Sequence, residues 1–249
     1  MAYQGACIIN NMRMETTPPS HSQGRELADE TVVTLVNLVP VVGGAVATLL
    51  TSALNNRLNE RRERWFSELA EAVKDLEDRF EGFDPDALAD NESFLDAVVT
   101  ATRTVDRSSQ REKIEALRNA VLNSALPSAP EPDIQQLYFA LVDDLTPTHL
   151  HLLTLLNDPP AWFDHRPELQ RPQFAITSNR VALIQAALPE LAEKGQQMIE
   201  RFYKALTDAS LVNGPLSGMM TADGAWQPVT TEFAANFLAF IRDPRASES

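Results

Sequence analysis

Apolar residues recur at helical spacing along most of this chain of 249 residues. The clearest stripe has intervals of three and four positions and consists of Phe66, Leu69, Val73, Leu76 and Phe80. This spacing predicts a long helix with one buried face, and the charged residues between these positions predict a solvated opposite face. Leucine and alanine are abundant and only 9 residues are glycine, which also favours helices over strands.

Capping signals and a short linker divide the rest of the pattern. Residues 109–112 have the form of a capping box that opens a helix, and Thr146 followed by Pro147 predicts the start of another. Residues 128–132 read SAPEP, a linker at which we place a domain boundary. The predicted organisation is a flexible leader over residues 1–30, a helical domain over residues 31–126 and a second helical domain over residues 133–242.

The pattern changes after Leu211. Asp223-Gly224 is a turn pair that is typical of hairpins, and Thr230 or Thr231 can cap a last, phenylalanine-rich helix. Helix, two packed helices, short hairpin and helix is the order found in a winged helix-turn-helix. The predicted fold class is therefore mainly α, with an N-terminal helical domain followed by a winged-helix-like domain that contains one short β-hairpin.

An uncharged apolar segment covers residues 31–56 and has two interpretations. Its length suits a membrane-spanning helix, and the arginines that follow it would place the bulk of the chain on the cytoplasmic side. Pro40, Gly43 and Gly44 interrupt the run, so membrane insertion is marginal on the sum of transfer energies. The alternative is a bent helix that is buried in the core of the protein.

A group of arginines follows this segment directly. Arg57, Arg61 and Arg64 approximate one helix face and precede Trp65, an arrangement that suits the surface of an anionic membrane or another interface. The alternative is an ordinary mixed-charge helix start, because glutamates are interleaved with the arginines.

Charge and motifs narrow the classes of function. The net charge of −14 is spread evenly over both halves and makes nucleic acid an unexpected partner. We find no catalytic motif and no convincing metal-ligand spacing, and the chain has 1 cysteine. We therefore expect no enzymatic activity, no cofactor, no metal and no small-molecule substrate.

The order of features resembles a known family. The apolar segment, the basic start of the next helix and the sequences SQREKIEALRNAVLNSAL, TPTHLHLLTLL and VTTEFAANFLAFI together resemble uncharacterised bacterial proteins of the abortive-infection alpha group. The resemblance implies a role in defence against phage and assigns no active-site residue.

The function that we expect is non-enzymatic. The chain would act through protein contacts with a partner or a second copy, in phage defence or a stress response, in the cytoplasm or at the cytoplasmic face of the inner membrane. The alternative is a soluble acidic scaffold or a protein that resembles winged-helix transcription regulators.

Overall fold

The computed structural model describes residues 44–80, 83–218 and 220–246. Within these residues the protein is mainly helical, as the sequence predicts, and has one two-stranded antiparallel sheet. The chain divides into two compact units, residues 1–58 and 59–249. The predicted leader and the first part of the apolar segment, with Pro40 and Gly43, lie outside the described residues.

Helix α2 extends over Gly44–Arg79, so Gly44 is its first residue. In the first unit the structure describes only the opening turns of this helix, with Arg57 on an exposed position. None of the helices in the described part of the chain is long and apolar enough to cross a membrane. Whether residues 31–56 contact a membrane stays a prediction.

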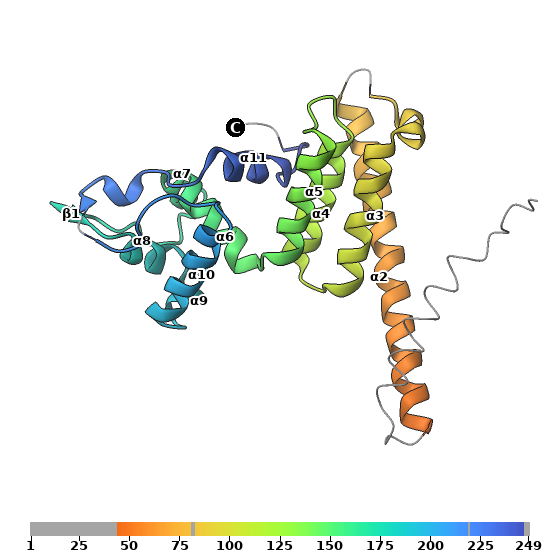
Figure 1. Cartoon of the computed structure of the whole chain (residues 1–249), viewed down its shortest axis with the longest axis horizontal. Helices are drawn as coiled ribbons and strands as arrows, with labels where there is room; N and C mark the ends of the chain where they lie inside the picture. The colour runs from red at the N-terminus through yellow and green to blue at the C-terminus, as the bar shows by residue number, and fades with distance from the viewer. Residues whose placement is uncertain (1–43, 81–82, 219, 247–249) are drawn as a thin grey trace, which may run out of the picture. The chain divides into compact units, whose positions relative to one another are not determined.

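The second unit continues α2 and adds a group of helices that pack side by side (Figure 1). They are η1 (Pro85–Asp90), α3 (Glu92–Arg107), α4 (Arg111–Ser124) and α5 (Pro132–Asp144). The predicted capping box at residues 109–112 is not formed. Helix α4 is preceded by Gln110, whose amide donates to the Ser108 hydroxyl, and no side chain caps the helix.

Further helices follow along the second unit. They are α6 (Pro147–Asn157), α7 (Pro159–Asp164), α8 (Arg180–Ala187), α9 (Pro189–Ala192), α10 (Gln196–Asp208) and α11 (Glu232–Phe240). Thr231 caps α11, because its hydroxyl accepts a hydrogen bond from the amide of Ala234 at 3.2 Å. At the start of α6, the amide of Thr146 donates to Nδ1 of His149 at 3.2 Å.

The predicted hairpin at Asp223-Gly224 is wrong. Strand β2 (Met220–Thr221) pairs with β1 (Thr177–Ser178), and helices α8, α9 and α10 lie between the two strands in the sequence. Asp223 has φ −89° and ψ −6°, whereas the hairpin turn that Asp-Gly favours needs a positive φ there. The chain instead enters the short 3-10 helix η2 (Gly224–Trp226).

A corner formed by Ser178 and Arg180 explains this choice. The Ser178 hydroxyl donates to the Thr221 carbonyl at 2.6 Å and accepts from the amide of Ala225 at 2.9 Å. Arg180 is 3% exposed and donates to the carbonyls of Pro215 and Gly224. These side chains satisfy the backbone groups of the loop, so the loop does not need a hairpin ladder.

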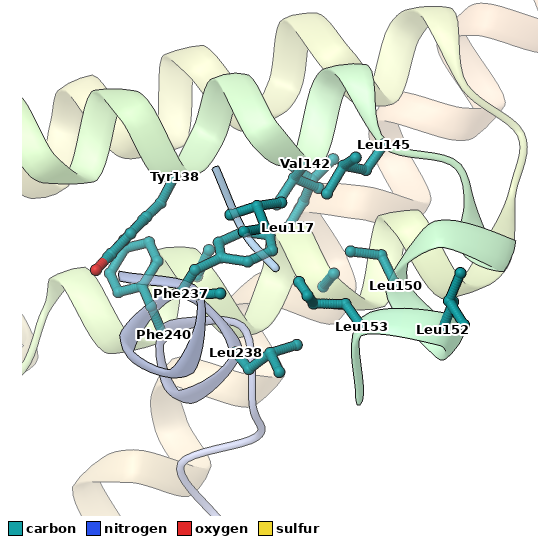
Figure 2. Close-up of a cluster of buried hydrophobic side chains, with 14 of the residues drawn as sticks. Leu117, Tyr138, Val142, Leu145, Leu150, Leu152, Leu153, Phe237, Leu238 and Phe240 are labelled. Carbon is teal, nitrogen blue, oxygen red and sulfur yellow. The ribbon is translucent and has the colours of Figure 1, made fainter. Parts of the chain in front are cut away.

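The core of the second unit joins helices α4, α5 and α6 to the last helix, α11 (Figure 2). Tyr138 of α5 lies 5.6 Å from Phe237 and 5.3 Å from Phe240 of α11, measured between ring centroids. Asn119 donates to the carbonyl of Ile241, and Asn123 donates to that of Phe240. These contacts connect the parts of the chain on either side of residues 128–132, which lie inside one compact unit.

The apolar face of α2 is turned slightly from the predicted stripe. Leu69 and Leu76 are buried as predicted, but Phe66 and Phe80 are 48% and 37% exposed. Trp65 and Ala72, each 1% exposed, take their place on the buried face. Trp65 and not Phe66 therefore begins the buried face, and its ring nitrogen donates to Thr102 of α3.

Candidate functional site

An open pocket of about 430 Å³ lies between α2, the α3–α4 turn and α4, within the second unit. Its charged residues are Arg61, Arg64, Glu68, Arg111, Glu115 and Arg118. Four arginines and two glutamates give this pocket a net charge of +2 in a chain whose net charge is −14. We call it the arginine pocket.

Helical spacing explains why these side chains meet. On α2, Arg61, Arg64 and Glu68 stand at i, i+3 and i+7 and so share one face. On α4, Arg111, Glu115 and Arg118 stand at i, i+4 and i+7 and also share one face. The packing of the two helices brings both faces to one pocket.

Arg61 and Trp65 fix the α2 side of the pocket. Nη1 of Arg61 donates to the carbonyls of Val105 and Asp106 at 3.2 and 3.0 Å, which satisfies acceptors in the last turn of α3. Nε1 of Trp65 donates to the Thr102 hydroxyl at 3.1 Å. Because Trp65 is 1% exposed and belongs to the core, its interpretation as a membrane-surface residue is corrected.

Arg118 lies deeper in the pocket than the exposed Arg64 and Arg111, with 20% of its side chain exposed. Its guanidinium lies 3.7 Å from a carboxylate oxygen of Glu68 and 3.9 Å from one of Glu115. Charge-assisted hydrogen bonds have lengths of about 2.7–2.9 Å, so both contacts are loose. The buried Nε atom of Arg118 finds no acceptor among the described residues. Its hydrogen-bonding capacity is not used up within the fold.

Arg64 and Arg111 form the exposed edge of the pocket. Neither makes an ion pair with a residue that the structure describes. Their guanidinium groups are therefore open to a ligand. Arg57, which the sequence groups with Arg61 and Arg64, is exposed on α2 but does not line this pocket.

Neighbouring cations are paired much more closely. Arg62 forms two hydrogen bonds with Asp106 through Nε at 2.8 and 3.0 Å, and this bonding raises the pKa of Arg62. Arg107 contacts Asp143 at 2.8 Å, and the buried Lys113 donates to the Asp143 carbonyl at 2.6 Å. The donors of these neighbouring cations are bonded within the fold, in contrast to those of the arginine pocket.

A second cavity, of about 640 Å³, lies between α4, α5 and α11. Rings of Tyr138, Phe233 and Phe240 line it, and Nδ2 of its Asn123 donates to the carbonyls of Phe240 and Arg242. These contacts hold the end of α11 against α4. The described residues contain no group of three or more His, Cys, Asp or Glu side chains that could hold a metal ion.

The sequence identified part of the candidate site. Arg61, Arg64 and Trp65 meet at the pocket, whereas Pro40 and Gly43 lie outside the described residues and Gly44 only begins α2. Sequence reasoning missed the contribution of α4, namely Arg111, Glu115 and Arg118. Their spacing over two helical turns was the available signal, but nothing in it showed that this face would meet the arginine face of α2.

Comparison with known proteins adds no relative. No protein-family model matches the chain, and no significant match was found among curated proteins or solved structures.

Proposed function

We infer that this chain is a non-enzymatic binding protein that acts through contacts with another protein, and that the arginine pocket receives an acidic group of that partner. The observation that carries this proposal is the convergence of Arg64, Arg111 and Arg118 on one open pocket with donors left over. Arginine presents its donors as a planar fork that matches carboxylate and phosphate oxygens. A pocket of this kind supports recognition of an anion.

The distribution of charge supports a protein partner. A nucleic-acid strand presents many phosphates, and a chain with a net charge of −14 repels such a polyanion outside this one pocket. A folded partner can present one or two acidic groups at the pocket and match the remaining surface with neutral or basic residues.

The later helices belong to this proposal as a winged-helix-like module. The order of α8, α10 and the loop closed by the bridge between Val212 and Thr230 supports that description. In this module Arg180 donates to backbone carbonyls of the adjacent loop, so these donors are not available for DNA phosphates. We therefore propose that the module contacts a protein and not DNA. The resemblance to abortive-infection alpha proteins supports a bacterial, cytoplasmic setting in defence or stress response.

Contact with the inner membrane is the second candidate function. Phe66 is 48% exposed on α2, close in sequence to the arginines that line the pocket. An exposed aromatic ring beside cations suits the boundary of an anionic lipid surface. Under this proposal, vesicle binding decreases when Phe66 is replaced by serine.

Fluorescence anisotropy with a labelled acidic peptide tests the protein-contact proposal. We compare the full chain with the double variant Arg64→Ala/Arg111→Ala and with Arg201→Ala, a single charge removal on an exposed position of α10. The proposal predicts binding that weakens with salt and falls about tenfold or more in the double variant, with little change in the control. An equal loss of affinity in the control would show that binding depends on overall charge and would contradict the assignment of the binding site to the arginine pocket.

A further inference from the structure

We propose that the group taken by the arginine pocket is a phosphate carried by a phosphorylated side chain of the partner protein. This inference rests on the proposed binding function and names its ligand. Three observations carry it: the origin of the donors on two helices, the charge of the pocket and its size.

The donors reach the pocket from two helices. Arg64 comes from α2, and Arg111 and Arg118 come from α4. A carboxylate is planar and offers two oxygens, so one arginine fork already matches it. A phosphate group offers three strong acceptor oxygens in a tetrahedral arrangement, which donors from different directions can share.

The charge of the pocket fits a phosphate better than a carboxylate. Its net charge of +2 follows from four arginines and two glutamates. A phosphorylated side chain carries about −1.5 to −2 at pH 7, whereas a single carboxylate carries about −1. The two glutamates are included in this net charge. Glu68 and Glu115 stand at 3.7 and 3.9 Å from Arg118 and therefore hold it only loosely.

The anchoring of the pocket supports a defined site. Arg61 is held by the carbonyls of Val105 and Asp106, and the ring of Trp65 forms a buried wall beside it. The cavity of about 430 Å³ is larger than one phosphate group, so it leaves room for the side chain that carries the phosphate. One phosphate on a protein also avoids the repulsion that a whole nucleic-acid strand would meet at this acidic chain.

Titration calorimetry on the full chain tests the inference with defined probes. They are inorganic phosphate, acetate, a Gly-Ser peptide with one phosphoserine, the same peptide with glutamate in its place, and phosphatidylcholine vesicles that contain phosphatidic acid. We expect the phosphoserine peptide to bind about tenfold or more tightly than the glutamate peptide, and inorganic phosphate to compete with it. The double variant Arg64→Ala/Arg111→Ala should lose this preference, while Arg201→Ala keeps it. Both pocket side chains are exposed, so unchanged thermal unfolding checks that the double variant is folded.

Each other outcome has a definite meaning. Equal binding of the glutamate and phosphoserine peptides overturns the phosphate inference and leaves the proposed function standing. Pocket-dependent binding of the vesicles without binding of the phosphoserine peptide overturns the protein source of the phosphate. If neither peptide binds, or if the double variant binds as well as the wild type, both the inference and the proposed function are wrong.

Discussion

The arginine pocket and the corner around Arg180 use the same side chain in opposite ways. Arg118 and Arg180 each bury an Nε atom that has no acceptor among the described residues. Arg180 is 3% exposed, and its remaining nitrogens donate to two backbone carbonyls of the loop before and within η2. Arg118 is 20% exposed and has only two carboxylates at 3.7 and 3.9 Å.

Arg245, near the C-terminus, is an arginine whose donors are bonded within the fold. Arg245 donates to Asp243 at 2.8 and 2.9 Å and to Asp75 at 3.0 Å, and the Asp243 hydrogen bonds raise the pKa of Arg245. Among the described residues, no carboxylate lies as close to Arg64, Arg111 or Arg118. The difference teaches that burial alone does not decide the role of an arginine, because the side chains of Arg245 and Arg118 are 17% and 20% exposed. The number of donors left unbonded does, because leaving a buried donor without an acceptor costs free energy that a ligand can recover.

The largest expected effect is a loss of stability when Trp65, the buried wall of the pocket, is truncated. Trp65→Ala should lower the free energy of unfolding by about 3–5 kcal/mol, because it removes a buried ring and leaves a cavity against α3. Urea denaturation measures this change. Trp65→Phe is the matched control and should cost less, and a small effect of Trp65→Ala would show that the residue lies outside the core.

The next effect compares Arg118 with Arg180, two arginines that each have a buried Nε atom without an acceptor among the described residues. Arg180→Ala should destabilise the chain by about 2–3 kcal/mol, because it leaves the carbonyls of Pro215 and Gly224 without their charged donor. Arg118→Ala should cost less than about 1 kcal/mol, since its contacts are long and partly solvated. Urea denaturation of both variants checks the order, and the reverse order would contradict the division into structural and ligand-binding arginines.

A ligand bound in the pocket should stabilise the fold by a moderate amount. A phosphate probe at about ten times its dissociation constant should raise the free energy of unfolding by about 1.4 kcal/mol. Arg118→Ala should remove most of this stabilisation, whereas Arg245→Ala should keep it, because Arg245 does not line the pocket. Thermal unfolding with and without probe measures it, and an equal gain in both variants would point to a non-specific ion effect.

The smallest effect is a pH dependence in the later helices. Burial lowers the pKa of His149, and its Nδ1 accepts a hydrogen bond from the amide of Thr146, which also needs the neutral ring. Because the folded-state pKa lies below the unfolded value of about 6.5, this stability is present above that pH and is lost as the pH falls through the folded-state pKa. His149→Gln keeps an acceptor for the cap and should reduce this loss, as urea denaturation at neutral and mildly acidic pH would show. An unchanged acid response would assign the dependence to other groups.

Much of the fold could be predicted from the sequence, because helical periodicity and caps are local signals. The buried positions Leu69 and Leu76 and the cap at Thr231 are examples. The hairpin at Asp223-Gly224 could not be judged locally, since Ser178 and Arg180 satisfy that loop from about forty positions away in the sequence.

The candidate site shows the same limit. The arginine spacing on α2 is visible in the sequence, and the spacing of Arg111 and Arg118 on α4 is equally regular. The two arginine faces meet only because α2 and α4 pack against each other. The spacing within one helix does not determine that packing. The sequence therefore predicts the α2 side of the pocket but not the α4 side, and Trp65 is a buried wall of it.

The most direct test of the central claim is NMR spectroscopy of the arginine side chains, in which the Nε–Hε resonances are followed during titration with phenyl phosphate. We expect resonance shifts at Arg64, Arg111 and Arg118 that saturate together, while the resonances of Arg180 and Arg245 do not shift. Saturating shifts that are as large at Arg180 and Arg245, or no saturation at the pocket arginines, would contradict the claim that the arginine pocket is the site at which this protein binds its ligand.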